Sequence, residues 1–224
     1  MNMQEGKKVD AACSRVSSRI SRDHEEVQLP GSSAKYFDRN QPIERLSGNL
    51  PHWRQHGVIY FVAFRLVDSL PQSRLKTWRA ERDAWLKAHP EPHTPELRRQ
   101  YHELFSVHFH RWLDEGHGSC ILSVPENRAI VEDALRGFDG LRYCLDEFVV
   151  MPNHVHALVT PIGGHTLSSI VKSWKSYSAK AINRRRGSSG ALWQKESFDH
   201  IVRSPVSLER FREYIRNNPK PRAK

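Results

Sequence analysis

The chain has 224 residues, a formal net charge of +10 at pH 7 and 38% hydrophobic residues, with six tryptophans. This length fits one domain with an appendage or two small domains, and the hydrophobic content is sufficient for a buried core. The surplus of positive charge indicates a polyanionic partner, either nucleic acid or an anionic membrane surface. No apolar run approaches the roughly 20 residues of a membrane-spanning helix, so no membrane partner is expected.

The N-terminal residues 1–45 are polar, rich in serine, arginine and glutamate, and show little periodicity. They predict a mostly disordered basic arm without a secretory signal. Cys13, Cys120 and Cys144 are scattered and odd in number, which indicates reduced thiols rather than a disulfide framework. A cytoplasmic protein is therefore expected.

Hydrophobic periodicity predicts strands and helices after this arm. Residues 58–66 are almost all apolar, which is typical of a central, buried strand. Two helices are predicted next, over residues 73–88 and 96–114, with three prolines between them. Together they form a helical hairpin, residues 71–118, inserted after the first strand.

The second half of the chain continues this alternation. The predicted elements are a helix over 124–137, strands over 141–150 and 154–160, a helix over 167–185, an extended segment or edge strand over 193–202, and a helix from Ser204 to Asn218 at the latest. Their order indicates the α+β class, with a ferredoxin-like antiparallel or mixed sheet, helices packed on it and the hairpin as an insertion. The predicted domain covers residues 46–220, followed by a short tail at 221–224.

A pair of histidines in the strand 154–160 is the most informative motif. The surrounding residues 148–160 are rich in β-branched and aromatic side chains, which favour a strand. Because residues i and i+2 of a strand share one face, His154 and His156 are predicted to project side by side. Two neutral imidazoles at this spacing provide half of a divalent metal site. A hydrogen-bonded pair of sheet histidines is the alternative.

His108 and His110 have the same spacing in a different setting. The apolar residues around them recur at helical intervals. Positions i and i+2 of a helix diverge by roughly 200°, so these two histidines are predicted to be structural or solvent-facing rather than metal-binding.

The last predicted helix brings a phenol and a carboxamide onto one face. Leu208, Phe211 and Ile215 form its core-facing side, and Tyr214 and Asn218 are spaced i, i+4 on an adjacent face. If this helix lies beside the histidine strand, two imidazoles and an amide oxygen hold a divalent cation, with the phenol one turn away. That arrangement suits attack by tyrosine on a phosphodiester. Taken singly, Tyr214 also fits a core aromatic, and Asn218 fits a helix C-cap.

Short motifs recur in a specific order along the chain. They are residues 48–54, 65–71, Met151–His156, Trp174–Tyr177, Ile182–Arg184, Leu192–Gln194, Phe198–Arg203 and Arg212–Pro219. Together these motifs resemble the HUH single-tyrosine transposases of the IS200-like type, specifically the REP-associated tyrosine transposase branch. The resemblance covers about residues 46–220.

This resemblance implies that His154, His156 and Asn218 bind Mg²⁺ or Mn²⁺ and that Tyr214 is the nucleophile. It implies a transposase-like, domesticated enzyme that nicks and joins single-stranded DNA at palindromic repeat hairpins through a transient 5′-phosphotyrosine bond. No small-molecule substrate is expected, and a nucleoid-associated location follows from the DNA partner. Monomer and homodimer are both compatible with the sequence.

Basic residues gather on and just after the helix 167–185, with aromatic side chains between them. Basic side chains contact phosphates and exposed aromatic rings stack on unpaired bases, so this face is predicted to bind DNA. An ordinary solvated face is the alternative, and Trp174 is predicted to be a core residue. The predicted DNA-binding residues are Lys172, Lys175, Tyr177, Lys180, Arg184, Arg185 and Arg186.

Other interpretations stay open at this level. Asp199 and His200 either orient a metal ligand or serve as structural groups of the edge strand. For the whole chain, the alternative is a regulatory hairpin-DNA-binding protein that does not cut. A metal-dependent hydrolase in which Tyr214 only packs, and an RNA-binding ferredoxin-like domain, are two further candidates.

Overall fold

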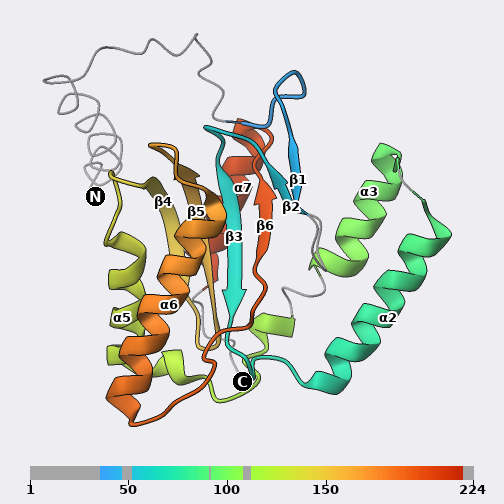
Figure 1. Ribbon diagram of the computed structural model, residues 1–224. Coiled ribbons are helices and arrows are strands. Elements are labelled where there is room, and N and C mark those ends of the chain that lie inside the picture. The colour runs from blue at the N-terminus through green and yellow to red at the C-terminus, as the bar shows by residue number, and fades with distance from the viewer. Residues whose placement is uncertain (1–35, 47–51, 91, 108–111, 219–224) are drawn as a thin grey trace, which may run out of the picture.

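A four-stranded antiparallel sheet forms the centre of the molecule (Figure 1). The computed structural model describes residues 36–46, 52–90, 92–107 and 112–218. The strand order of the sheet is β4-β5-β3-β6, and each neighbouring pair is antiparallel. The strands are β3 (Tyr60–Arg65), β4 (Tyr143–Val150), β5 (His154–Pro161) and β6 (Phe198–Ile201).

The chain passes through the sheet as strand, helix, strand, strand, helix, strand. The two helices of this series are α5 (Pro125–Arg136), between β3 and β4, and α6 (Leu167–Arg186), between β5 and β6. This succession is the split β-α-β arrangement of ferredoxin-like folds. The predicted α+β class, the antiparallel sheet and the central position of the first apolar strand are confirmed.

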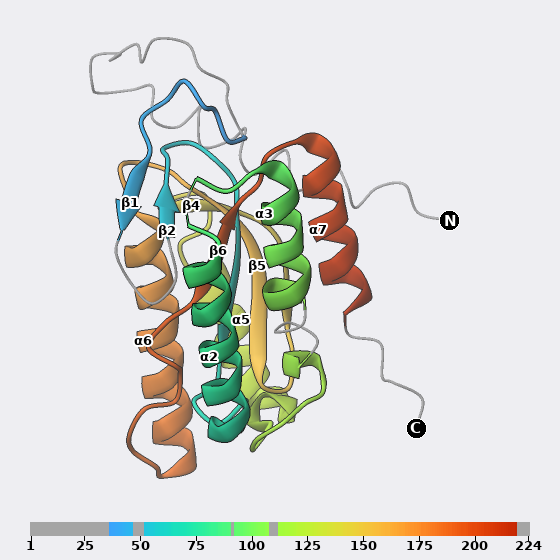
Figure 2. The ribbon, with the colours of Figure 1, turned by 90° about the vertical axis from the view of Figure 1, so that its right-hand side faces the viewer.

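Different helices cover the two faces of the sheet (Figures 1 and 2). Leu135 of α5 and Trp174 of α6 belong to one core cluster together with Phe64 of β3. On the other face, Ile215 of α7 (Pro205–Asn217) belongs to a second cluster together with Phe61 of β3. Because side chains alternate along a strand, β3 supplies its even-numbered residues to α5 and α6 and its odd-numbered residues to α7.

Capping residues fix where α6 and α7 begin. Thr166 precedes α6, and its side chain accepts a hydrogen bond from the backbone N–H of Ser169. Ser204 precedes α7, with Pro205 at the first helical position, and Ser204 and Ser207 form a capping box. The predicted N-cap before proline is confirmed.

The predicted helical insertion is present and has a small core of its own. It consists of α2 (Gln72–Ala88), α3 (Pro95–Tyr101) and the π-helix η1 (His102–Val107), and the short η2 (Ile121–Ser123) precedes α5. Trp78 of α2 and Phe105 of η1 are buried in a cluster separate from the two sheet clusters.

The second helix of the insertion differs from the prediction of one continuous α-helix over 96–114. The hydrogen bonding widens after α3, where the π-helix begins, and residues 112–114 are helical again. A change of helix type within one segment leaves the apolar spacing nearly unchanged, so periodicity did not reveal it. His108 and His110 lie outside the described residues.

The N-terminal part of the described chain is more ordered than predicted. β1 (Glu44–Leu46) pairs with β2 (His52–Arg54) in a separate two-stranded sheet. The backbone N–H of Phe37 donates to the carbonyl of Val202 at 3.0 Å, next to the edge strand β6. Residues 36–45, at the end of the predicted arm, thus contact the folded domain, while residues 1–35 lie outside the described chain.

Two observations bear on the expected cellular setting. Cys120 is a free thiol, whereas Cys144 is disulfide-bonded, so the prediction of reduced thiols is confirmed for Cys120 and wrong for Cys144. Cys13 is not among the described residues. Across the described ranges, no helix combines the length and apolarity needed to span a bilayer.

Candidate metal and tyrosine site

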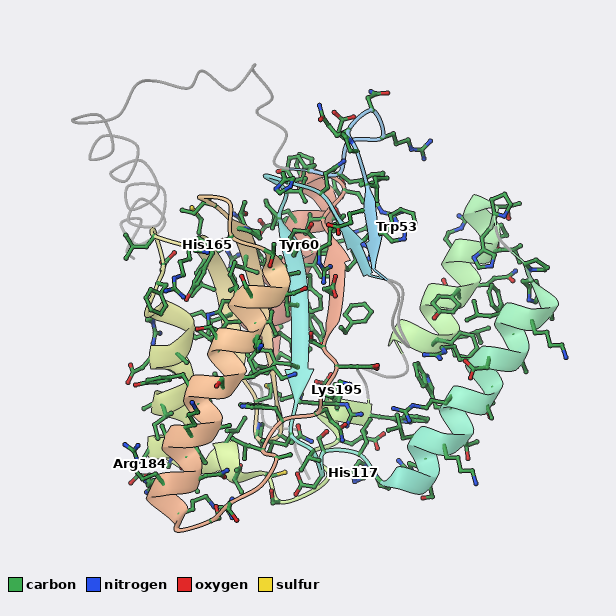
Figure 3. All side chains as sticks on the ribbon, viewed as in Figure 1. Trp53, Tyr60, His117, His165, Arg184 and Lys195 are labelled. Atoms are coloured by element: carbon green, nitrogen blue, oxygen red, sulfur yellow. The ribbon has the colours of Figure 1, made fainter. Side chains whose placement is uncertain are left out.

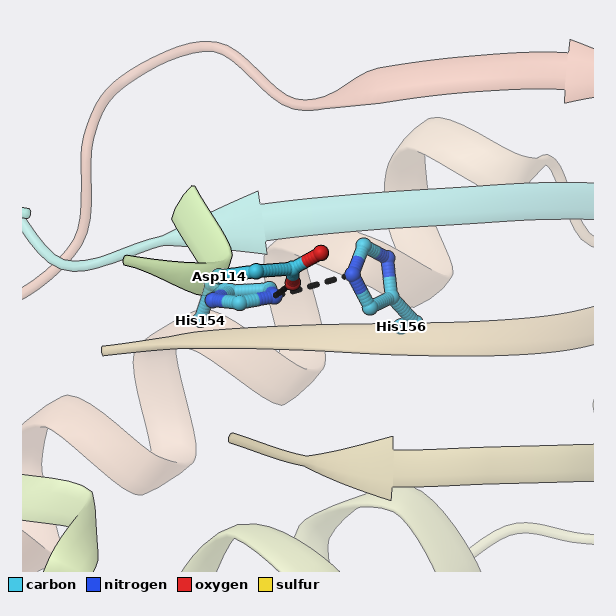
Figure 4. A group of neighbouring side chains, drawn as sticks. All are labelled: Asp114, His154 and His156. Carbon is cyan, nitrogen blue, oxygen red and sulfur yellow. Dashed lines mark hydrogen bonds and ion pairs between the residues drawn. The ribbon is translucent and has the colours of Figure 1, made fainter. Parts of the chain in front are cut away.

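The two histidines of β5 project side by side, as predicted (Figure 4). They lie on the face that α7 covers, because Ala63, the partner of His156 in the strand register, belongs to the core cluster of α7. Both side chains are fully buried, and their Nε2 atoms are 2.9 Å apart. Ala63 of β3 lies opposite His156 in the strand register, and its small side chain leaves room for the imidazole. The ring of Phe61 stacks against His156 with the ring centroids 5.3 Å apart.

Asn153 fixes the orientation of the His154 ring. Its fully buried side chain donates through Nδ2 to the carbonyl of His117 at 2.9 Å. Its Oδ1 is therefore the acceptor that lies 2.7 Å from His154 Nδ1, which assigns the ring proton to Nδ1. Burial lowers the pKa of His154 below its ordinary value, against the opposing effect of Asp114. His154 is thus neutral, with a lone pair on Nε2 that can coordinate a cation.

A third potential ligand comes from the helical insertion. Asp114 places Oδ1 3.4 Å from His154 Nε2. This oxygen is buried and has no hydrogen-bond partner within the described residues. Burying a carboxylate oxygen without a partner is unfavourable, and a cation at this position would compensate for it. The ligand atoms of Asp114, His154 and His156 all lie within 4.8 Å of one another.

Two of the separations among these atoms match those between neighbouring ligands of an octahedral divalent cation. Ligand atoms at adjacent corners of an octahedron, with metal–ligand distances near 2.1 Å, are about 3 Å apart. The separations of 2.9 Å between the imidazole nitrogens and 3.4 Å between Asp114 Oδ1 and His154 Nε2 are close to that value. Imidazole nitrogen with carboxylate oxygen is a donor set for first-row divalent ions. The three residues could therefore hold such an ion.

The helix α7 presents Tyr214 to this cluster. Phe211 of α7 stacks on Phe61 of β3 with the ring centroids 4.5 Å apart, which anchors the helix on the sheet. The hydroxyl of Tyr214 lies 3.3 Å from His156 Nε2 and 3.5 Å from Asp114 Oδ2. Burial, and then the negative charge of Asp114, raise the pKa of the Tyr214 phenol above its ordinary value. The phenol is therefore protonated at neutral pH.

Asn218, predicted as the third metal ligand, directly follows α7 and lies beside Tyr214. The Asn218 side chain is close enough to the Tyr214 phenol to lower its pKa against the larger effect of burial, and its buried Nδ2 has no hydrogen-bond partner among the described residues. Asn218 also lines a cavity of about 860 Å³ together with Asp114 and Asn217. The structure thus brings the predicted nucleophile, the histidine pair and Asn218 into one region, with Asp114 in addition.

The site residues of β5 and α7 lie in one segment of the chain, and this segment matches the model of a known protein family. Residues 137–218 match the family model described as Transposase IS200 like. The IS200-like segment contains both histidines, Tyr214 and Asn218, and the predicted resemblance to IS200-like transposases is confirmed over these residues. Asp114 and the helical insertion precede the segment.

Other comparisons give weaker similarities. An uncharacterized protein of Haemophilus influenzae is 29% identical over 97 residues, which cover 34% of this chain and 53% of that protein, about half of its length. A structure of the REP-associated tyrosine transposase bound to a REP hairpin is 16% identical, with a TM-score of 0.37, over 72% of this chain and 66% of that one. A candidate transposase from Deinococcus radiodurans R1 is also 16% identical, with a TM-score of 0.34, over 71% of this chain and 89% of that one.

The predicted DNA-binding residues of α6 lie on the opposite face of the sheet from Tyr214 (Figure 2). Trp174 is 2% exposed and donates to the Tyr143 hydroxyl at 2.9 Å, so its predicted core position is confirmed. Arg184 lies near the C-terminal end of the helix (Figure 3). The exposed members of the predicted set are Lys172, Tyr177, Lys180, Arg184, Arg185 and Arg186.

Two members of this set have partners inside the protein. The Lys175 ammonium donates to the carbonyls of Gln194 and Lys195, at 2.6 Å and 2.9 Å, and burial lowers its pKa to about 8. Lys175 therefore fastens α6 to the segment before β6. Arg185 lies 3.2 Å from a carboxylate oxygen of Glu126 and so connects α6 to α5.

The two polar residues of β6 point to opposite faces. Asp199 is opposite Val62 in the register, on the face of α6, where it forms an ion pair with Arg54. Of the two predicted interpretations, the structural group of the edge strand fits Asp199. His200 points to the face of the histidine pair, and its ring centroid lies 5.9 Å from that of Phe211 on the helix of Tyr214.

Asp114 and Asn153 are the residues of this site to which the sequence pattern assigned no role. Asn153 directly precedes the histidine pair, and a polar residue next to a buried imidazole is the available signal for an orienting group. Asp114 offers a weaker signal, because it differs from other acidic residues only in standing at the end of the predicted helix. The path by which the insertion returns to the sheet is not encoded in local periodicity.

Proposed function

We propose that this protein is a metal-dependent endonuclease and strand transferase that acts on single-stranded DNA through Tyr214. The observation that carries the proposal is the position of the Tyr214 hydroxyl, 3.3 Å from His156 Nε2 and 3.5 Å from Asp114 Oδ2. A nucleophile next to a candidate cation site is the arrangement that phosphoryl transfer requires. The match of residues 137–218 to IS200-like transposases supports the same class of reaction.

The proposed ligands of the divalent ion are His154, His156 and Asp114, with the amide oxygen of Asn218 as a fourth. When bound, Mg²⁺ or Mn²⁺ polarises the phosphate and offsets the negative charge that develops during transfer. The chain contributes the placement of its donors: Asn153 holds the His154 ring in the orientation that turns Nε2 toward His156 and Asp114. Placement and electrostatics are the main contributions a protein makes to phosphoryl transfer.

In the proposed reaction, the hydroxyl oxygen of Tyr214 attacks the scissile phosphorus. The Oη–P bond forms and the P–O3′ bond breaks, which gives a 5′-phosphotyrosine and a free 3′-hydroxyl. Asp114 Oδ2 accepts the hydrogen bond of the phenol and is placed to take its proton, while the leaving oxygen takes a proton from solvent. Attack by a 3′-hydroxyl on the phosphotyrosine reverses the step and joins strands.

The DNA partner is proposed to be a hairpin with single-stranded flanks, held by the exposed basic residues of α6. The net charge of +10 supports a polyanionic partner. The side chain of Tyr177 is 58% exposed on α6, between basic residues, where it can stack on an unpaired base. The proposed contacts are Lys172, Tyr177, Lys180, Arg184, Arg185 and Arg186.

A protein that binds hairpin DNA without cutting is the second candidate. The observation that favours it is the position of the basic helix, because α6 and Tyr214 lie on opposite faces of the sheet. DNA can therefore occupy α6 without reaching the phenol. The two functions differ in one product, the covalent complex between protein and DNA.

The test is incubation with a labelled single-stranded palindromic repeat and Mn²⁺, followed by a denaturing gel. The wild type is expected to form a covalent adduct that requires the metal, and Tyr214→Phe is expected to form none while binding the same DNA. Tyr177→Phe is the matched control, because it removes an exposed hydroxyl from α6 but keeps the ring that is proposed to stack on a base, so DNA binding and the adduct should both remain.

Three results would count against the proposal. Binding without any adduct in the wild type would support the binding protein. Cleaved DNA with a free 5′-phosphate and no protein attached would indicate water as the nucleophile, and thus a hydrolase. An adduct that persists in Tyr214→Phe would assign the nucleophile to another residue.

A further inference from the structure

An irregularity in β4 turns two consecutive acidic residues toward α7. Between Leu145 and Phe148, three steps along β4 oppose only two steps along β5, which defines a β-bulge. Leu145 and Phe148 both pack in the core cluster of α5 and α6. The two residues between them, Asp146 and Glu147, therefore share the opposite face instead of alternating.

Two arginines of α7 bind these carboxylates. Arg212 places Nε and Nη2 each 2.9 Å from Asp146 Oδ2. Arg216, one helical turn later, places Nε 2.9 Å and Nη2 2.8 Å from Glu147 Oε1. Arginines spaced i, i+4 project from the same side of a helix, and the bulge supplies one carboxylate for each.

Glu209, one turn before Arg212, connects the two pairs. Its Oε2 accepts from Arg212 Nη1 at 3.4 Å, and its Oε1 accepts from Arg216 Nη1 at 3.0 Å. All three nitrogens of each guanidinium are thereby in use. A single exposed ion pair contributes little to stability, but a network with guanidinium forks restricts geometry as well. We call the five residues, Asp146, Glu147, Glu209, Arg212 and Arg216, the β4–α7 clamp.

We propose that the β4–α7 clamp positions Tyr214 for attack; this inference rests on the function proposed above. Tyr214 lies between Arg212 and Arg216 in α7, so the two ion pairs fix both the rotation of the helix about its axis and its position along β4. A misplacement of about 1 Å can reduce the rate of an enzymatic step by about 100-fold. The clamp residues act through the helix and are positioning residues.

The experiment compares Asp146→Asn, Arg212→Gln and the double variant with the wild type. Arg210→Gln is the matched control, because it removes an exposed arginine from the same helix. At saturating hairpin DNA and Mn²⁺, we expect each clamp variant to form the covalent adduct about 10- to 100-fold more slowly. DNA affinity should stay within about 2-fold of the wild type, since the proposed DNA contacts lie on α6. The double variant should be no slower than the slower single variant, because the two residues form one unit.

The clamp would be overturned by wild-type rates in both single variants, or by losses that multiply in the double variant. A loss of equal size in Arg210→Gln would do the same. If the wild type forms no adduct, the proposed function fails. Hydrogen exchange of the backbone amides of α7 then tests whether the clamp residues hold this helix in place. Faster exchange in Asp146→Asn and Arg212→Gln than in wild type and Arg210→Gln supports it, and equal exchange contradicts it.

Discussion

Replacement of Asp114 by asparagine tests the proposed metal site. Asp114 Oδ1 is buried, lacks a hydrogen-bond partner in the described part of the chain and lies 3.4 Å from His154 Nε2. Asparagine keeps the shape of the side chain and one oxygen but removes the negative charge. If Asp114 is a ligand, the variant should bind Mn²⁺ more weakly without losing its fold.

The expected magnitude follows from the removal of this charge. Two unit charges about 4 Å apart interact by about 4 kcal/mol at the effective dielectric constant of a partly buried site. The carboxylate must also be desolvated on binding, which offsets part of this interaction. We therefore expect a loss of about 2–3 kcal/mol in the binding free energy, which corresponds to roughly 30- to 150-fold weaker Mn²⁺ binding.

Urea denaturation at fixed Mn²⁺ measures this difference. A cation at 100 times the Kd of the wild type stabilises its fold by about 2.7 kcal/mol. The same concentration lies within a few-fold of the Kd expected for Asp114→Asn and should stabilise that variant by less than about 1 kcal/mol. Without metal, the variant should be no less stable than the wild type, because a buried charged oxygen without a partner has been removed.

Glu115→Gln provides the matched control. Glu115 is the next carboxylate along the chain, but it is exposed and pairs with Arg74 at 3.2 Å and His117 at 2.9 Å. Its replacement should leave the effect of Mn²⁺ unchanged. Equal stabilisation of wild type and Asp114→Asn by Mn²⁺ would refute the assignment of Asp114 as a ligand.

Changes in α6 test the opposite face of the sheet. Trp174→Phe removes a buried hydrogen bond and part of a buried ring. Urea denaturation should therefore show a free energy of unfolding that is lower by about 2–3 kcal/mol, and an unchanged midpoint would contradict this packing. Replacing Arg184 and Arg186 by glutamine should weaken DNA binding. The slope of the logarithm of the binding constant against the logarithm of the salt concentration should become shallower by about 0.7 for each phosphate that the protein no longer neutralises, and the adduct rate at saturating DNA should stay unchanged. An unchanged slope would exclude both arginines from the interface. Burial lowers the pKa of Lys175 to about 8, so between that pH and its ordinary pKa the unfolded chain alone holds the proton. The stability of wild type relative to Lys175→Met should therefore rise by about 1–2 kcal/mol from about pH 7.5 to about pH 10, after allowance for solvent screening, and a flat or falling difference would contradict the lowered pKa.

Local periodicity was sufficient to predict the part of the site that lies on β5 and α7. Alternation along a strand determines that His154 and His156 share a face, whatever surrounds them. The capping signal at Ser204 and the proline after it determine where α7 begins, and helical spacing then aligns Phe211 with the core and Tyr214 beside it. These features depend on residues close together in the sequence, which is why they could be read from it.

The remaining features depend on packing between distant segments. Alternation alone would place Asp146 and Glu147 on opposite faces of β4. The bulge that unites them forms because Leu145 and Phe148 both enter the same core cluster, a result of three-dimensional packing rather than of spacing. The position of Asp114 likewise follows from how the insertion returns to the sheet, where Asn153 holds the carbonyl of residue 117.

The proposed DNA-binding residues and the proposed nucleophile lie on different faces of the sheet, which the sequence alone did not indicate. The basic residues of α6 and Tyr214 of α7 both belong to the segment that matches IS200-like transposases, yet the whole thickness of the sheet lies between them. Packed layers are about 10 Å apart, so one nucleotide cannot contact both helices of one chain. Under the proposed function, a hairpin held by α6 must send its single-stranded flank around an edge of the sheet, or to a second copy, to reach the phenol. Changes in α6 should therefore alter DNA affinity, whereas changes in Asp114 or the β4–α7 clamp should alter the adduct rate at saturating DNA. A variant of either group that changed both the affinity and the rate would argue against separate surfaces for binding and cleavage.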